Sequence, residues 1–397
     1  MRMSIRSDFR SFFAIEGAGP LIAGMFLYGI GTGILAPMNA VYMRDGIGLS
    51  KGEIASIFSI ALLLNMATTI AVGTISDRIR RKKALPIAAS ALCMCGLSVY
   101  MLADGYGLTL AGMILAVAPS GLIMGQLFAM ARNHFLRKAH SFYEMAQIWL
   151  RATLSVGFFT GLLIGANVYL IAGFRGILWG NWLGYASLFA LLLVYREHET
   201  KADSPASRSE PFSVLMLLAL LLLSCGDALR GLYLPLVVVQ LFGKPQTMSY
   251  LWSVQAVFEL LFMTLAGYWA ARYGSRRVIA VASGFALAVY IAYSFSPPLA
   301  VFFAVQPLYS FYVSVLYGVA MGYVQRMFHS RIGFGSSLYV ALSQTASLVG
   351  YLLPFLVTGY SPAIFVIPAA LVASALALMG IATAADRRRS RNSATAV

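Results

Sequence analysis

The sequence GTISDRIRRK, residues 73–82, joins two long apolar runs, and GYWAARYGSRR, residues 267–277, joins another two. The first glycines of these stretches are 194 residues apart, and other residues keep the same spacing. The pairs are Gly73 with Gly267, Arg78 with Arg272, Asn65 with Glu259, and Arg132 with Arg326. One such match carries little weight, but four at a single spacing predict a duplicated unit, with one copy in each half of the chain.

The composition excludes a soluble globular domain. Of the 397 residues, 60% are hydrophobic and 11% are charged, whereas soluble domains carry about 25% charged residues. The mean hydropathy of +0.79 also excludes a disordered chain. A membrane-spanning helix takes about 20 residues, so the length suits about a dozen spans and leaves no room for a sizeable aqueous domain.

Hydropathy along the chain predicts twelve membrane-spanning helices in two groups of six. The segments are 20–43, 53–75, 84–103, 108–131, 145–170 and 174–195, followed by 212–240, 248–271, 277–296, 299–324, 335–358 and 361–383. Strands of a transmembrane barrel would alternate at every second residue, and these runs are uniformly apolar. We therefore expect an all-α integral membrane protein, with twelve transmembrane helices in two pseudo-symmetric six-helix bundles.

The basic residues predict how the chain lies in the membrane. Of the 29 Lys and Arg residues, 23 fall in termini or connections on one side of the predicted bundles. Cytoplasmic loops carry the excess of positive charge, so both termini are expected in the cytoplasm. The expected domains are 1–195, a cytoplasmic linker at 196–211, and 212–397 with a basic tail. Anionic lipid headgroups account for the net charge of +15, and we expect no nucleic-acid partner.

No pattern in the sequence indicates a metal, a cofactor or an enzyme. Cys93, Cys95 and Cys225 lie inside apolar runs, which argues against disulfides and thiolate metal sites. The four histidines form no HExxH pattern, and neither a nucleophile elbow nor a phosphate-binding glycine loop occurs. We therefore expect neither a membrane enzyme nor an ATP-driven pump. A receptor or scaffold that moves no solute stays open as an alternative.

Four charged residues stand out because they lie deep inside predicted spans: Arg151, Asp227, Arg230 and Glu259. Charge in a span is costly and is a functional-site hypothesis by default. Glu259 has Gln255 one turn earlier, and Arg151 has Gln147 in the same relation. Glu259 is either a carboxylate held by a cation such as Arg151 or, as we favour, a carboxyl that gains and loses a proton during transport. Asp227 and Arg230 either neutralise each other or contact a substrate.

Amide side chains inside the spans suit a polyhydroxylated ligand, because hydroxyls left unpaired in a dry site are penalised. These amides are Asn39, Asn65, Gln126, Gln147, Gln255, Gln306 and Gln344. Some of them are expected to join helices instead. The aromatic residues Trp149, Trp252, Tyr309 and Tyr312 are candidate sugar platforms, although most aromatic side chains pack against neighbours or lie at the membrane interface.

The two stretches quoted first resemble the loop signature of the major facilitator superfamily, Gly-x-x-x-Asp-Arg/Lys-x-Gly-Arg/Lys-Arg/Lys, and the likeness in topology and length covers essentially the whole chain. The resemblance implies a cytoplasmic gate made of Gly73, Asp77, Arg78, Arg81, Gly267 and Arg272. In it, Asp77 ties to a neighbouring helix end. Arg80 stands at the second glycine position, and Ala271 replaces the acid of the second copy. We therefore expect no acid role in the second loop.

Four segments resemble the bacterial sugar efflux transporter family: GILAPMNAVYMRDGIGLS, GQLFAMARNHF, LRATLSVGFFTG and FELLFMTLAGYWAARYGSRR. The likeness includes Asn65, Gln126, Arg151, Glu259 and Gln325. It implies a proton-coupled exporter of sugars or glycosides that works by alternating access in the bacterial inner (plasma) membrane. A multidrug or other small-metabolite transporter of the same superfamily is the alternative. We expect a monomer, since nothing in the sequence requires an oligomer.

Under this hypothesis Glu259 couples proton movement to transport. The expected substrate-binding residues are Asn39, Asn65, Gln126, Gln147, Arg151, Asp227, Gln255, Gln306 and Gln344.

Overall fold

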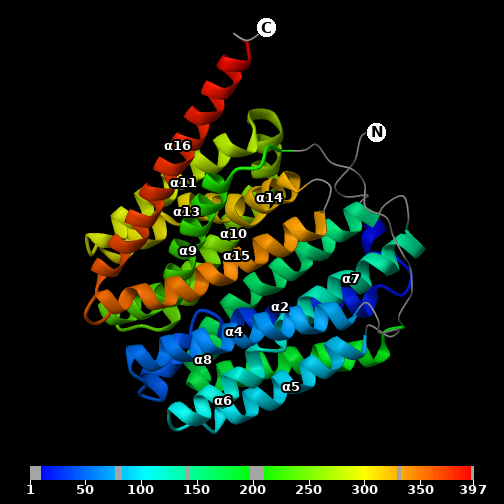
Figure 1. Cartoon of the computed structure of the whole chain (residues 1–397). Helices are drawn as coiled ribbons and strands as arrows, with labels where there is room; N and C mark the ends of the chain where they lie inside the picture. Colours follow the sequence, from blue (N-terminus) through cyan, green and yellow to red (C-terminus); the bar gives the residue numbers. More distant parts are fainter. Residues whose placement is uncertain (1–9, 77–82, 140–142, 197–209, 329–331, 395–397) are drawn as a thin grey trace. The chain divides into compact units, whose positions relative to one another are not determined.

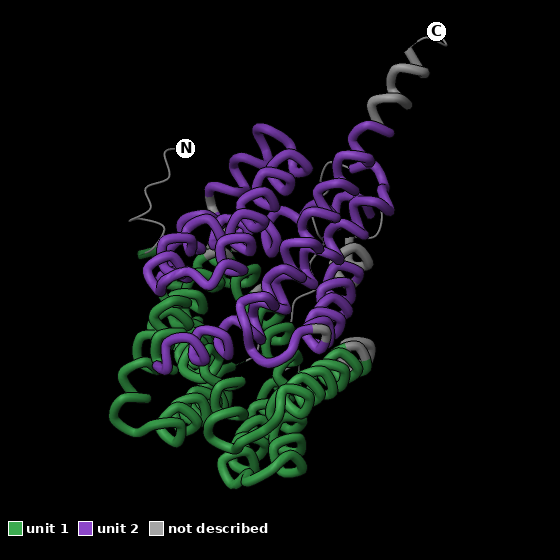
Figure 2. Tube along the Cα trace, turned by 90° about the vertical axis from the view of Figure 1, so that its left-hand side faces the viewer, with its two compact units in different colours: residues 1–204, 245–253 green, residues 205–244, 254–397 purple. Residues whose placement is uncertain are grey.

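The structure is a computed structural model that describes residues 10–76, 83–139, 143–196, 210–328 and 332–394. The described residues form helices joined by short connections (Figure 1). The chain divides into two compact units, residues 1–204 with 245–253 and residues 205–244 with 254–397 (Figure 2). The expected linker at 196–211 stays a prediction, because most of it lies outside the described residues.

The helices of the first unit follow the apolar runs of the sequence. They are α2 (Gly19–Leu35), α3 (Asn39–Val41), the π-helix η1 (Tyr42–Gly46), α4 (Lys51–Ser76), α5 (Ala84–Met101), α6 (Tyr106–Val117), α7 (Ser120–Lys138) and α8 (Tyr143–Val194). A capping box explains where α4 begins. The Ser50 backbone N–H donates to Glu53 Oε2 at 2.8 Å, and the Glu53 backbone N–H donates to Ser50 Oγ at 3.3 Å.

The helix α8 is a hairpin of two arms. Its 52 residues would reach about 78 Å as a straight helix, whereas the hydrocarbon core of a bilayer is about 30 Å thick. Gly173 interrupts it with φ +60° and ψ −153°, a conformation that glycine adopts readily. Both arms pack closely against α2. A Cβ built on Gly33 would lie 2.2 Å from the Phe158 carbonyl oxygen, and one on Gly31 would lie 2.7 Å from Gly184 Cα.

A break between α6 and α7 is stabilised by side chains from α4. Pro119 follows α6 and has no N–H to continue the helical ladder. The Nδ2 atom of Asn65 donates to the carbonyl oxygens of Val117 and Ala118, at 2.7 and 3.2 Å. Thr68 Oγ1 also donates to Ala118, at 2.7 Å. These bonds satisfy carbonyl groups that the break leaves outside the ladder.

The second unit is built around α9 (Val214–Phe242), which packs against α15 and α16. The remaining elements are α10 (Gln246–Tyr273), α11 (Ser275–Ser294), α12 (Leu299–Ala304), α13 (Gln306–Ser314), the π-helix η3 (Val315–Ala320), α14 (Met321–Met327), α15 (Ile332–Leu352), the 3-10 turns η5 (Leu353–Leu356) and η6 (Pro362–Phe365), and α16 (Val366–Ala394). Of α10, only the part from residue 254 onward belongs to the second unit. Ser213 caps the start of α9, and Gly243, with φ +67°, ends it.

Ten helices of the described chain are long and apolar enough to cross a membrane, or eleven if the bent pair Gln246–Met263 and Leu265–Tyr273 forms one span. That figure counts the hairpin α8 once. Its two arms match the expected spans 145–170 and 174–195, so dividing α8 at Gly173 reconciles the described helices with the twelve predicted spans. The prediction of an all-helical membrane protein is confirmed.

The duplication is also visible in one local contact. The Nδ2 atom of Asn65 donates to Ser120 Oγ at 3.4 Å, and Ser314 Oγ donates to the Glu259 backbone oxygen at 3.2 Å. Asn65 and Glu259 are 194 residues apart, as are Ser120 and Ser314. Each serine lies where its span is irregular, at the break before α7 or at the junction of α13 and η3. This recurrence supports the repeat proposed from the sequence.

Candidate functional site

The helix α9 carries an acid and a base on one face. Asp227 and Arg230 are three residues apart, so their side chains leave the same side of the helix. Arg230 is 2% exposed. Among the described residues the two side chains form no direct ion pair. Tyr309 of α13 links them, because its hydroxyl donates to Asp227 Oδ1 and its ring centroid lies 3.5 Å from the Arg230 guanidinium carbon.

A second tyrosine also donates to Asp227. The hydroxyl of Tyr317, in η3, lies 2.6 Å from Asp227 Oδ2. Each carboxylate oxygen therefore accepts one phenolic hydrogen bond, and bonds to a charged acceptor are stronger than neutral ones. The two donors differ in exposure, since Tyr309 is fully buried and Tyr317 is 46% exposed.

Gln306, at the start of α13, holds Arg230 from the other side. Its Oε1 atom accepts from Arg230 Nη2 at 2.9 Å. Its Nε2 atom donates to the Tyr293 hydroxyl and to the Phe302 carbonyl oxygen, both at 2.8 Å. Gln306 is fully buried. Because every polar atom of this amide is engaged, its geometry suits positioning the guanidinium better than binding a ligand.

Glu259 and Gln255 lie one turn apart on α10, as their spacing predicts. Both side chains are partly buried, and they interact with each other. The Oε1 atom of Gln255 is buried and has no hydrogen-bond partner among the described residues. Glu259 also interacts electrostatically with Asp227 and Arg230 of the same unit. The second unit thus gathers two carboxyl groups and one guanidinium beside an amide oxygen that lacks a donor.

The first unit has two amides with unsatisfied atoms of its own. Gln126 Oε1 on α7 and Gln147 Nε2 on α8 are buried and lack a hydrogen-bond partner in the described part of the chain. Arg151, one turn after Gln147, has an exposed side chain with its guanidinium carbon 5.4 Å from the Phe128 ring centroid. Since buried polar atoms are nearly always paired, these amides are candidates for contact with a ligand.

Other predicted ligand-binding amides bond within their own unit. Asn65 bridges to the break before α7, as described above. Asn39 Oδ1 accepts from the Tyr100 hydroxyl at 2.8 Å, and Asn39 Nδ2 lies 3.8 Å from Met113 Sδ. Gln344, on α15, is partly buried. The structure therefore separates amides that join helices from amides that keep an unsatisfied atom.

The candidate aromatic platforms also divide. Tyr309 packs in the Asp227 network, and the Tyr312 hydroxyl donates to the Leu223 carbonyl oxygen at 2.8 Å. Trp149 stacks on Phe12, with ring centroids 6.5 Å apart. Trp252, in contrast, has a buried indole N–H without an acceptor among the described residues.

The gate implied by the resemblance is described in part. Three of its residues lie outside the described residues: Asp77, Arg78 and Arg81. Gly73 lies near the end of α4. A Cβ on Gly267 would meet nothing within 4 Å, and the Arg272 guanidinium carbon lies 5.4 Å from the Tyr273 ring centroid. Gly267 therefore borders open space in this structure.

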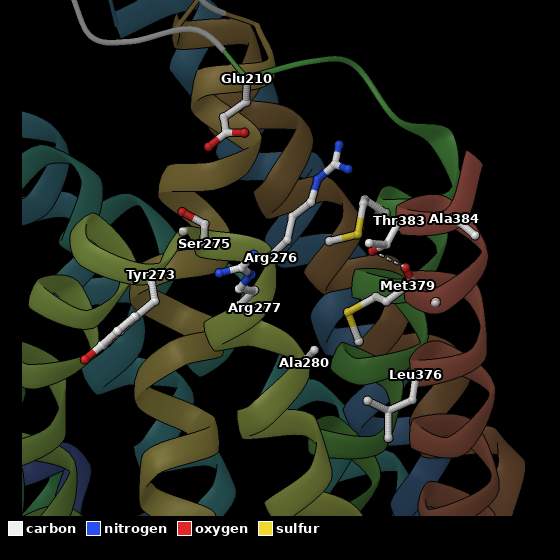
Figure 3. Close-up of a pocket in the computed structure, with 13 residues that line it drawn as sticks. Glu210, Tyr273, Ser275, Arg276, Arg277, Ala280, Leu376, Met379, Thr383 and Ala384 are labelled. Atoms are coloured by element: carbon white, nitrogen blue, oxygen red, sulfur yellow. Dashed lines mark hydrogen bonds between the residues drawn. The ribbon is translucent and has the colours of Figure 1, made fainter. Parts of the chain in front are cut away.

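An acid that the sequence analysis did not select lies beside the second loop. Glu210 donates its backbone N–H to the Arg326 carbonyl oxygen at 2.9 Å, and its carboxylate lies 3.7 Å from Arg326 Nε. Arg326 Nη2 in turn donates to Ser275 Oγ at 2.6 Å. Glu210 and Ser275 border a cavity of about 900 Å³ at the start of α11 (Figure 3). The loop that lacks an acid at Ala271 thus has one nearby from the end of the linker.

Tyr317 and Glu210 were the functional candidates missing from the sequence analysis. Tyr309 and Tyr317 are eight residues apart, about two helical turns, so a search for partners of Asp227 on one face would have selected both. Glu210 gives no comparable signal, because its partner Arg326 lies far along the chain.

A helical membrane fold with an internal repeat, and with buried charges and unsatisfied amides inside its spans, defines a secondary transporter. The sequence matches the profile described as "Major Facilitator Superfamily" over residues 21–216. This match identifies the protein as a Major Facilitator Superfamily transporter and not an enzyme.

Several known proteins are similar to this chain. "Sugar efflux transporter B" of Salmonella typhimurium is 23% identical over 327 residues, covering 79% of this chain and 82% of the relative. "Maltose permease" of Geobacillus stearothermophilus is 25% identical over 316 residues, covering 77% and 78%. The crystal structure of the nucleoside transporter NupG superimposes with a TM-score of 0.76 at 11% identity, covering 93% of this chain and 98% of that one. The last likeness concerns the fold alone.

Proposed function

We propose that this transporter exports sugars or glycosides in exchange for protons, and that Glu259 is the proton-coupling carboxyl. The observation that carries the proposal is the pair on α10, where a carboxyl without an ion pair among the described residues adjoins Gln255, whose Oε1 atom has no donor. A carboxyl that is not locked in a direct ion pair can alternate between protonation states, and an unpaired amide oxygen can accept a hydrogen bond from a cargo hydroxyl. The names of the sugar efflux relatives point to the same cargo.

The unsatisfied polar atoms indicate which of the predicted residues contact cargo. We assign that role to Gln126, Gln147 and Gln255, which keep such atoms, and we retain Arg151, Asp227 and Gln344 as cargo contacts on the sequence prediction. Three other amides form hydrogen bonds within their own unit: Asn39, Asn65 and Gln306. We propose that the two asparagines hold helices together and that Gln306 holds Arg230 in place. This division agrees with the energetics of hydrogen bonds. Leaving a buried polar group without a partner costs more free energy than one additional hydrogen bond contributes, so amides that already have partners are expected to keep them.

The proposal extends to the membrane and the gate. We propose that the protein lies in a bacterial plasma membrane with both termini in the cytoplasm, since basic residues dominate that side. The six gate residues named from the resemblance would then act at the cytoplasmic surface, where Glu210 and Arg326 also lie beside the second loop.

Transport in proteoliposomes tests the cargo and the coupling together. Labelled lactose, glucose, maltose and a hydrophobic drug are each assayed for counterflow, with and without an imposed pH gradient. We expect counterflow of a sugar and uphill movement only when the gradient is present. In Glu259→Gln, uphill movement is expected to disappear while counterflow stays measurable, because exchange needs no net proton movement.

A matched control is Glu53→Gln in the capping box of α4. This substitution also replaces a carboxyl by an amide, but it lies outside the proposed site. It is expected to keep uphill transport. Undiminished uphill transport by Glu259→Gln would refute the proton role. Counterflow of the drug without any sugar would refute the cargo and favour the multidrug alternative.

A further inference from the structure

The carboxylate of Asp227 has two hydroxyl partners that are not equivalent. Tyr309 is fully buried, and it is held by the Arg230 guanidinium on its ring face and by the edge of Tyr290, with ring centroids 6.1 Å apart. Tyr317 is 46% exposed and is joined to Asp227 Oδ2 at 2.6 Å. One oxygen of the carboxylate therefore has a fixed donor, and the other has a donor at the border of open space.

The backbone beneath Tyr317 is suited to movement. Tyr317 lies in η3, a π-helical stretch within the span that runs from α12 to α14. Such stretches strain the helical ladder and are frequent at functional sites. The hydroxyl of Tyr339 donates to the Leu316 carbonyl oxygen, and a Cβ on Gly318 would meet nothing within 4 Å. The segment that carries Tyr317 is thus tethered by two hydroxyl groups and faces free space.

A cargo hydroxyl offers the chemistry that Tyr317 supplies. Phenolic and alcoholic hydroxyls each donate one hydrogen bond to a carboxylate oxygen. If one replaces the other, Asp227 keeps both of its acceptors satisfied, and no buried charge is left without a donor. An apolar cargo cannot make this replacement, which would leave Oδ2 unpaired.

We propose that Tyr317 is an internal competitor for the cargo site: its hydroxyl occupies the Asp227 Oδ2 atom that a hydroxyl group of the cargo takes during transport. The proposal rests on the proposed function, since it requires a polyhydroxylated cargo. Tyr309 keeps the carboxylate in position throughout the exchange. Departure of Tyr317 removes one tether from η3, which links cargo binding to a change in the shape of this span.

The test measures affinity after the competing hydroxyl is removed. Lactose, glucose and maltose are titrated by calorimetry into the full-length protein in detergent. In Tyr317→Phe we expect the dissociation constant of a sugar to fall about tenfold, which corresponds to about 1.4 kcal/mol. Loss of a hydroxyl that merely supports the fold, or that donates directly to the cargo, would not tighten binding. Asp227→Asn is expected to weaken binding at least tenfold.

Tyr339→Phe is the matched control. It removes a hydroxyl that tethers the same π-helical stretch through a backbone carbonyl and makes no hydrogen bond to a carboxylate among the described residues, so sugar affinity is expected to stay within a factor of two. If Tyr339→Phe raised sugar affinity as much as Tyr317→Phe, loosening the span would be enough to explain the tighter binding. That result would overturn the proposal that Tyr317 competes with the cargo.

A second measurement follows the span itself. In a Gly318→Cys variant, sugar is expected to change the rate of maleimide labelling at residue 318 several-fold, and that response is expected to vanish when Tyr317→Phe is added. Unchanged or weaker sugar binding in Tyr317→Phe overturns the competitor role while leaving the sugar proposal intact. No binding of any of the three sugars to the unmodified protein overturns both.

Discussion

Replacing a glutamine by leucine is expected to have unequal consequences at two positions of the second unit. Gln306 makes three hydrogen bonds, to Arg230, Tyr293 and Phe302, and is fully buried. Gln255 is only partly buried, and its Oε1 atom has no partner among the described residues. The same substitution therefore breaks a complete set of bonds at one site and removes an unsatisfied atom at the other.

The magnitudes follow from the groups that are left behind. Gln306→Leu removes the acceptor of a guanidinium that is 2% exposed, and a hydrogen bond to a charged group contributes about 1.5–3 kcal/mol. The Tyr293 hydroxyl and the Phe302 carbonyl lose a partner as well. We expect the free energy of unfolding to fall by about 3 kcal/mol or more. For Gln255→Leu we expect a change below about 1 kcal/mol in either direction, since relief of the unpaired oxygen offsets the lost contact with Glu259.

Equilibrium unfolding in mixed detergent micelles, with sodium dodecyl sulfate as denaturant, measures both variants. Sugar binding is measured on the same preparations and is expected to be lost in Gln255→Leu. Equal destabilisation by the two substitutions would refute the division between amides that position groups and amides that bind cargo. So would normal sugar affinity in a stable Gln255→Leu protein.

Two further predictions concern packing and the linker. In Gly33→Ala the new methyl group would lie 2.2 Å from the Phe158 carbonyl oxygen, so we expect the free energy of unfolding to fall by about 1–3 kcal/mol. The control is Gly125→Ala, whose methyl group would meet nothing within 4 Å. This control is expected to be neutral or to stabilise the protein by up to about 1 kcal/mol. Glu210→Gln is expected to lower the free energy of unfolding by less than about 1 kcal/mol, because the side chains of Glu210 and Arg326 are each 29% exposed. The same substitution is expected to speed proteolysis of the linker. An unchanged cleavage rate would show that the ion pair does not hold the linker in place.

The positions of the spans could be predicted from the sequence because the lipid bilayer requires apolar side chains along the whole length of each span. Each span must be a long apolar helix, so hydropathy located both arms of α8, which Gly173 separates. The repeat spacing of 194 residues was equally direct, and the equivalent pairs Asn65 with Ser120 and Glu259 with Ser314 are both hydrogen-bonded, although through different atoms. The identity of the charged residues in the spans was also visible, since lipid makes such residues rare.

From the sequence alone, hydropathy predicted an all-helical membrane protein and the 194-residue spacing predicted an internal duplication. The sequence also identified a short set of polar residues inside the spans as functional candidates. Only the tertiary structure decided which hydrogen bonds each of these residues makes. Gln306 and Gln255 are the same residue type in similar apolar surroundings, yet one is saturated by Arg230 and its neighbours and the other keeps an open acceptor. Hydrogen bonds depend on which distant atoms come within about 3 Å, and that distance is set by the packing of whole helices.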